Sequence, residues 1–288
     1  IHNLSYLGII RLKLIDASNK KLAGGLIKEL DEIFSKQDKN YFTFWGLPET
    51  FYSKEANEVE IDKLSPIVLF VYNRLDTLEK LISSLKLNSE CNKSDLIIFS
   101  DGPNVSINDD ILEVNKVRKY ISSLEGFKSI SIFENISNKG LANSIIDGLN
   151  YVSNNYESFI VLEDDLLVSP YFLKYMNSSL SKYKKETKVW CINGFGPNPD
   201  LFKLPKNLQN EFYWSLRPSS HGWGTWSDRW LRAIWTERRL SILLEKRINK
   251  RRVLLAGADI FSMFIEQTKK NIDSWGVRWV INACINNK

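Results

Sequence analysis

The sequence has 288 residues, of which 43% are hydrophobic and 25% charged, and its net charge is +5. This composition is ordinary for a soluble globular protein, and the length allows one large domain or two smaller ones. No apolar run approaches the roughly 20 residues that cross a bilayer. The cysteines, Cys91, Cys191 and Cys284, lack the spacing of a metal site or a disulfide framework, so we expect a reducing, cytoplasmic compartment.

Residues 1–64 differ in character from the rest and are expected to form an N-terminal helical extension. A helix is predicted at residues 20–35, with one apolar face formed by Leu22, Leu26, Leu30 and Ile33. The extension contains no motif with recognisable chemistry. We therefore expect the functional part of the chain in residues 65–288.

From Ser65 onwards, strands and helices are expected to alternate. Short apolar runs predict strands at residues 67–72, 95–100, 129–134 and 159–162, of which the first and the last are expected to be buried. Amphipathic patterns between them predict helices at residues 76–87, 109–123 and 141–154. This order predicts an α/β fold with a mostly parallel, Rossmann-like sheet flanked by helices. Such sheets bind ligands outside the carboxyl ends of their strands.

Polar residues follow each predicted strand, and they should meet at one edge of the sheet. The four groups are Asn73-Arg74, Asp101, residues 135–139, and the consecutive acids Glu163, Asp164 and Asp165. Adjacent carboxylates repel one another and favour a hard divalent cation, which can also bind a diphosphate. The alternative is a solvated acidic turn that opens a helix near Ser169 and Pro170.

Glycine-rich phosphate cradles are missing from the sequence. Neither G-x-G-x-x-G nor G-x-x-x-x-G-K-[ST] occurs, which disfavours dinucleotide and Walker-type sites. A metal held by the acidic cluster would be another device for binding a diphosphate.

Several motifs occur in a characteristic order along residues 65–288. They are Val71-Tyr72-Asn73-Arg74, Ser100-Asp101-Gly102, Asn138-Lys139-Gly140-Leu141-Ala142, Glu163-Asp164-Asp165 with Pro170-Tyr171-Phe172, Val189-Trp190-Cys191-Ile192-Asn193-Gly194, Gly222-Trp223-Gly224-Thr225-Trp226 and Asp273-Ser274-Trp275. In these motifs the chain resembles the nucleotide-sugar-dependent glycosyltransferases of the GT-A fold. The likeness is to the N-acetylglucosaminyltransferase I type and related bacterial sugar transferases, whose acidic "DxD" element holds the metal and the sugar nucleotide.

The resemblance implies a nucleotide-binding half at residues 65–165 and an acceptor and sugar half at residues 166–288. Further residues beyond Lys288 would be expected to close the acceptor side. The resemblance implies that Asp165 binds Mn²⁺ or Mg²⁺ and that Arg74 lies near the diphosphate or nucleotide. It also implies that Asp101 contacts the uracil and that Asp164 contacts the ribose or sugar. Further donor contacts are expected from Val71, Asn73, Lys139, Asn143, Glu163, Gly222 and Trp223.

The resemblance also implies an inverting reaction with a carboxylate as general base. Asp273 is the candidate base, and Asp164 is the second residue expected in the catalytic site. The motif departs from the family pattern because Ser274 stands where another acid is expected, so Asp228 and Glu211 remain rivals.

Eight tryptophans and Tyr213 contribute to an aromatic second half, and core packing is the expected role for most of them. Gly222, Trp223 and Gly224 are the exception, because small residues beside a large ring allow a ligand to approach the backbone. His221 could contact the sugar or diphosphate, or be an ordinary turn residue.

The implied function is metal-dependent transfer of a sugar from a UDP-sugar, such as UDP-N-acetylglucosamine, to a hydroxyl group in bacterial glycan or polysaccharide synthesis. The acceptor would be a glycan, a lipid-linked molecule or a protein. The alternatives are a sugar-phosphate nucleotidyltransferase, which would need a glycine-rich basic segment after the first strand, and a non-catalytic carbohydrate- or partner-binding module.

A basic segment at residues 238–252 is either the solvated face of a helix or a peripheral membrane contact. It lacks the interleaved aromatic residues of single-strand binders, so no nucleic-acid partner is expected.

Overall fold

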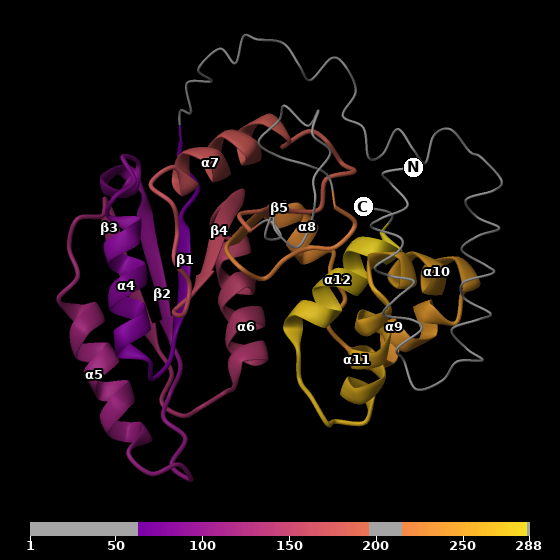
Figure 1. The fold of residues 1–288 in the computed structure, drawn as a ribbon, viewed down its shortest axis with the longest axis horizontal. Coiled ribbons are helices and arrows are strands. Elements are labelled where there is room, and N and C mark those ends of the chain that lie inside the picture. The colour runs from indigo at the N-terminus through magenta and orange to yellow at the C-terminus, as the bar shows by residue number, and fades with distance from the viewer. Residues whose placement is uncertain (1–62, 196–214, 287–288) are drawn as a thin grey trace, which may run out of the picture.

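The computed structural model describes residues 63–195 and 215–286. Within this part of the chain, six strands form one sheet in the order β3-β2-β1-β4-β6-β5 (Figure 1). The strands are β1 (Ile67–Val71), β2 (Asp95–Ser100), β3 (Ser129–Glu134), β4 (Ser158–Glu163), β5 (Ile192–Asn193) and β6 (Trp223–Trp226). Neighbours among β1 to β4 are parallel, whereas β6 runs antiparallel to both β4 and β5.

A helix follows each of β1, β2 and β3, as the sequence pattern predicts. The helices are α4 (Leu75–Leu85), α5 (Asp110–Ser122), α6 (Leu141–Ser153), α7 (Phe172–Lys182), α8 (Ser227–Leu231), α9 (Glu237–Leu244), α10 (Arg247–Ala256), α11 (Ala258–Thr268) and α12 (Trp275–Ile285), with a 3₁₀ turn at Cys91–Lys93. The predicted mostly parallel α/β sheet is therefore confirmed. The predicted extension and its helix at residues 20–35 lie outside the described residues.

Both faces of the sheet are covered at its centre, and β1 shows this directly, whereas the edge strand β3 is mostly exposed. All five of its residues are buried. Ile67, Leu69 and Val71 belong to a core shared with α4, α5 and α7. Val68 and Phe70 belong to a second core shared with α6 and α12 on the opposite face (Figure 1). Because both faces are buried, β1 is a continuous apolar run rather than an alternating one.

A tryptophan cluster joins the sheet to the C-terminal helices. Its members are Trp190, Trp223, Trp230, Trp235, Trp275 and Trp279, with ring centroids 4.4 to 6.1 Å apart in the contacting pairs. The expected core role of these aromatics is confirmed. Helices α9 to α12 then pack around a third core, which includes Leu240, Val253, Phe264 and Ile281.

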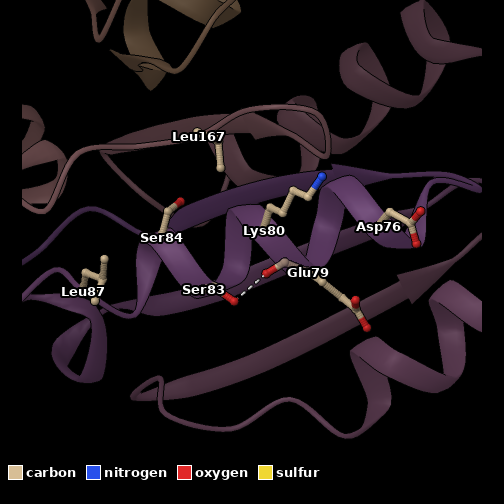
Figure 2. Close-up of a pocket in the computed structure, with 7 residues that line it drawn as sticks. All are labelled: Asp76, Glu79, Lys80, Ser83, Ser84, Leu87 and Leu167. Carbon is tan, nitrogen blue, oxygen red and sulfur yellow. Dashed lines mark hydrogen bonds between the residues drawn. The ribbon is translucent and has the colours of Figure 1, made fainter.

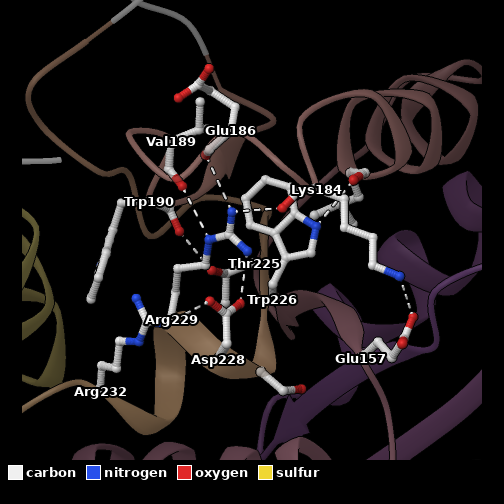
Figure 3. A network of polar contacts seen from close by, with 12 residues as sticks. Glu157, Lys184, Glu186, Val189, Trp190, Thr225, Trp226, Asp228, Arg229 and Arg232 are labelled. Atoms are coloured by element: carbon white, nitrogen blue, oxygen red, sulfur yellow. Dashed lines mark hydrogen bonds and ion pairs between the residues drawn. The ribbon is translucent and has the colours of Figure 1, made fainter.

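A buried arginine holds the connection between α7 and β5. The Arg229 side chain, on α8, is only 5% exposed and forms an ion pair of 2.7 Å with Asp228. Its guanidinium lies 4.1 Å from the Trp226 ring centre. It also donates hydrogen bonds to the backbone carbonyls of Lys184, Glu186 and Val189 (Figure 3).

Replacing this arginine should destabilise the fold. Arg229→Ala would remove three hydrogen bonds to backbone carbonyls and leave Asp228 without its buried partner, so we expect the free energy of unfolding to fall by about 3 kcal/mol. Arg232→Ala is a matched control, because Arg232 pairs with the same Asp228 at 3.6 Å but is exposed. The control should cost less than about 0.5 kcal/mol. Chemical denaturation measures both, and equal losses would contradict the structural role of Arg229.

Candidate donor and metal site

The carboxyl ends of β1 and β4 bring the predicted acidic cluster and Arg74 together. The strands are paired so that Phe70 lies beside Glu163. Arg74, just after β1, contacts both aspartates that follow β4. Its Nη1 lies 2.9 Å from Asp165 Oδ2, and its Nη2 forms a short ion pair with Asp164 Oδ1. The other Asp164 oxygen accepts a hydrogen bond of 3.2 Å from the Tyr72 backbone N–H.

The three consecutive acids differ in their exposure. Asp164 is 2% exposed, whereas the Asp165 side chain is 44% exposed. Burial raises the pKa of Asp164, and the positive charge of Arg74 opposes that rise. Burial also raises the pKa of Glu163 to about 7, assisted by the negative charges of Asp165 and Asp164. Asp165 is therefore the acid of this cluster that is most open to a ligand.

The carboxylate oxygens of Asp164 and Asp165 suit a hard divalent cation that also binds the phosphates of a substrate. Among residues 63–195 and 215–286, no group of three or more His, Cys, Asp or Glu side chains is arranged to hold a metal by itself. Magnesium-type sites commonly use one or two carboxylates together with substrate phosphates and water. One exposed carboxylate, Asp165, beside a second, Asp164, fits that kind of site.

Asp101 is positioned by a dense set of hydrogen bonds. Its carboxylate accepts from the backbone N–H groups of Gly102, Lys139 and Gly140 and from the Asn135 side chain, at 2.9 to 3.2 Å. These contacts tie the end of β2 to the loop between β3 and α6. A carboxylate has about four acceptor positions, so little capacity is left for a uracil N–H. The predicted uracil contact therefore stays a prediction beside an observed structural role.

Gly102 is required where these two loops meet. A Cβ atom at this position would lie 2.4 Å from the backbone carbon of Ser137. Any larger residue would push the loop between β3 and α6 away from Asp101.

Other predicted donor contacts lie near this edge with partners of their own. The Val71 carbonyl accepts from the Asp101 N–H at 3.0 Å. Lys139 Nζ pairs with Asp147 at 3.1 Å, and Asn143 donates to the Lys139 carbonyl at 2.9 Å. The Asn73 side chain donates to Asp110 at 2.6 Å. Their roles toward a donor stay predictions.

The approach of a donor to the backbone at Trp223 stays a prediction. The Trp223 side chain is fully buried and its ring stacks on Trp275 at 5.3 Å, so the indole packs in the core. The reason is pairing in the sheet, because β6 lies between β4 and β5 with every residue buried. Gly222 has a φ of 64°, a left-handed conformation that glycine adopts at no steric cost, and its carbonyl accepts from the Gly194 N–H.

His221 is an exposed residue in the turn before β6. Its Nδ1 lies 3.3 Å from the Ser219 hydroxyl, and its ring centre is 5.2 Å from that of Phe195. Both interpretations of His221 therefore stay open.

Asp273 lies in the loop between α11 and α12, just before Ser274, which caps α12. It forms an ion pair of 2.8 Å with Arg278, whose side chain is buried and also pairs with Glu237. Of the rival bases, Asp228 is held by Arg229, and Glu211 lies outside the described residues. Asp273 and Asp228 are thus both exposed aspartates held by a buried arginine, and both are compatible with a general base.

A separate hollow of about 680 Å³ runs along α4 (Figure 2). It is lined by Asp76, Glu79, Lys80, Ser83, Ser84, Leu87 and Leu167. None of these residues is among those predicted to bind a donor or a metal. We therefore place the candidate site at the strand ends and not in this hollow.

The basic segment maps to α9 and α10. Arg238, Arg239, Lys246 and Lys250 are exposed there. Within the described ranges, no helix is both long and apolar enough to span a membrane. Membrane contact through this segment stays a prediction.

Asp110 was missed by sequence reasoning. It begins α5, is buried, and bonds to Tyr72 and Asn73 from the loop after β1. The local pattern, two aspartates at a helix start, indicates only an ordinary N-terminus.

The acidic strand end facing Arg74, on a mostly parallel sheet with an antiparallel strand beside it, agrees with the arrangement that the sequence resemblance implies. The model of the GNT-I family matches residues 8–237, which is more than half of the chain. The chain therefore belongs to the GNT-I family. This membership confirms the predicted class of enzyme, a glycosyltransferase.

Solved structures show weaker likenesses. The chain is 16% identical to S. aureus TarS 1–349 in complex with UDP-GlcNAc, with 49% of this chain and 38% of that chain covered and a TM-score of 0.32. It is 10% identical to the mannosyltransferase PcManGT from Pyrobaculum calidifontis in complex with GDP-Man and Mn²⁺, with 96% and 81% covered and a TM-score of 0.45. The chain spans only 20% to 47% of the length of the TarS chains that it matches. Among curated proteins, none matches.

In the metal-free protein, Glu163→Gln should remove a pH dependence of stability. The pKa of Glu163 is about 7 in the folded state, against an ordinary 4.5, so folding favours its protonated form. This stabilisation is complete below pH 4.5 and is lost as the pH rises through about 7. Between about pH 5 and 8, wild type should lose about 1 to 3 kcal/mol relative to the variant. Chemical denaturation in the presence of a chelator measures this difference, and parallel pH profiles for the two proteins would contradict it.

Proposed function

We propose that this protein transfers a sugar from a UDP-sugar to a hydroxyl acceptor with the help of a divalent cation. The observation that carries the proposal is the contact of Arg74 with Asp164 and Asp165 at the ends of β1 and β4, in a chain of the GNT-I family. The family resemblance supports UDP-N-acetylglucosamine as the donor and Mn²⁺ as the cation. Glycan, lipid-linked and protein acceptors all remain open, as does the bacterial glycan pathway.

In this proposal, Asp165 and Arg74 act on the cation and on the diphosphate of the donor. Asp165, the most exposed acid of the cluster, holds the cation, which when bound supplies Lewis-acid stabilisation for the leaving nucleoside diphosphate. Arg74 pairs with Asp165 in the free protein. When that carboxylate is engaged, the guanidinium can donate to the diphosphate instead, so its charge stays paired.

The remaining roles concern the sugar and the acceptor. Asp164, held by the Tyr72 N–H and Arg74, accepts a hydrogen bond from a ribose or sugar hydroxyl. Asp273 takes the acceptor proton as the acceptor oxygen attacks the anomeric carbon, and the nucleoside diphosphate leaves from the opposite side. This in-line displacement inverts the configuration at that carbon.

Two alternatives make different products. A sugar-phosphate nucleotidyltransferase would release pyrophosphate from a nucleoside triphosphate, and a non-catalytic module would bind a sugar without turnover. The loop Tyr72–Leu75 has neither the glycines nor the basic cluster that the first alternative needs. Release of UDP from UDP-sugars in the presence of Mn²⁺ separates the proposed function from both.

Asp165→Ala should lose Mn²⁺-dependent UDP release by about 100-fold or more, because the exposed carboxylate that holds the cation is gone. The control is Asp259→Ala, which breaks a comparable exposed pair, Arg217 to Asp259 at 2.9 Å. The control should keep its activity. Both variants should remain folded by circular dichroism. Turnover retained by Asp165→Ala would remove the metal hypothesis.

Asp273→Asn should lower kcat by about 100-fold or more with little change in donor KM, because a general base acts on the acceptor and not on donor binding. Steady-state kinetics at saturating donor measure the effect. Asp228→Asn tests the rival base. A large loss of kcat in that variant, with none in Asp273→Asn, would reassign the base.

A further inference from the structure

A second buried carboxylate, Asp110, lies beside the candidate site and has no role in the proposal above. It is 2% exposed and accepts three hydrogen bonds. Its Oδ2 accepts from the Tyr72 hydroxyl in a short contact and from the Asn104 N–H at 2.6 Å. Its Oδ1 accepts from the Asn73 side chain at 2.6 Å. Asp110 thus joins the loop after β1 to the loop after β2.

Asp110 remains charged in this position. Burial opposes ionisation, but the hydrogen bonds from Tyr72, Asn104 and Asn73 outweigh it and lower the pKa of Asp110. Burial and the bond to Asp110 raise the pKa of Tyr72 to about 12, so its hydroxyl keeps its proton and donates. A buried anion with three donors makes strong, directional contacts.

These contacts restrain the segment that carries Arg74. Tyr72 donates its hydroxyl to Asp110 and its backbone N–H to Asp164, so the residue is held from both sides. Asn73, the next residue, is also held by Asp110. Arg74 itself is exposed and reaches Asp164 and Asp165 only from the end of this restrained loop.

We propose that Asp110 is a positioning residue of the donor site, which holds Tyr72 and Asn73 so that Arg74 faces the donor diphosphate. This inference rests on the proposed function. Asp110 does not touch the donor and acts through the loop. A loop that has to be ordered at the moment of binding reduces affinity, whereas a loop ordered beforehand does not.

The test compares Asp110→Ala with Asp110→Asn, with UDP and MnCl₂ as the probe in calorimetry. Alanine removes all three acceptor contacts, so we expect UDP to bind about 10-fold more weakly and the donor KM to rise in parallel. In Asp110→Asn, one oxygen can still accept from Tyr72 and Asn104, and its amide can donate to a rotated Asn73 side chain. Its affinity should stay within about 3-fold of wild type.

The matched control is Asp95→Ala, at the opposite end of β2, where Asp95 accepts from Ser129 at 2.7 Å. Asp95→Ala should weaken the pairing of β2 with β3 without changing UDP affinity. In Asp110→Ala, kcat at saturating donor should change less than KM, which a general loss of folded protein would not produce.

Three outcomes would overturn the positioning role. They are wild-type UDP affinity in Asp110→Ala, an equal loss of affinity in Asp95→Ala, and a loss in Asp110→Asn as large as in the alanine variant. If Asp110→Ala does not fold, Tyr72→Phe removes one contact and should weaken UDP binding about 3-fold. Unchanged affinity in Tyr72→Phe would then reject the role. Failure of the wild type to bind UDP would instead reject the proposed function.

Discussion

The ion pairs of Arg74 with Asp164 and Asp165 are the interaction on which the rest of the candidate site depends. Three consecutive acids at the end of a buried strand repel one another, and the positive charge of Arg74, just after the neighbouring strand, offsets that repulsion. The parallel pairing of β1 with β4 makes this possible, because it brings both carboxyl ends to one edge. The geometry also explains how the acids can exist together without a bound cation.

Most of the sheet could be predicted from the sequence, because its elements are defined by local patterns. The apolar runs of β1 to β4 and the amphipathic helices α4 to α6 lie within a few residues of their predicted bounds. The acidic cluster and Arg74 could be found for the same reason, since each follows a strand directly. Pairing of parallel strands then brings residues together that are 90 positions apart.

Other features depend on contacts that no local pattern shows. The Tyr72 to Asp110 bond spans 38 residues and links two loops, so nothing near Asp110 predicts it. The burial of Trp223 depends on β6 entering the sheet antiparallel to β4, where its ring meets Trp275 from a distant helix. A glycine-flanked tryptophan has the same local sequence whether it faces a ligand or the core.

The aspartates of this edge differ in what their oxygens already bind, and that difference leaves Asp165 as the one most open to a cation. Asp101 accepts hydrogen bonds from the loop before α6, and Asp110 accepts them from the loops after β1 and β2. Asp164 is buried between Tyr72 and Arg74. Asp165 alone among these four combines an exposed carboxylate with a partner, Arg74, that is itself exposed and can exchange it for another anion. Burying three carboxylates would be costly without their hydrogen bonds, and those same bonds hold the loops in place around the fourth.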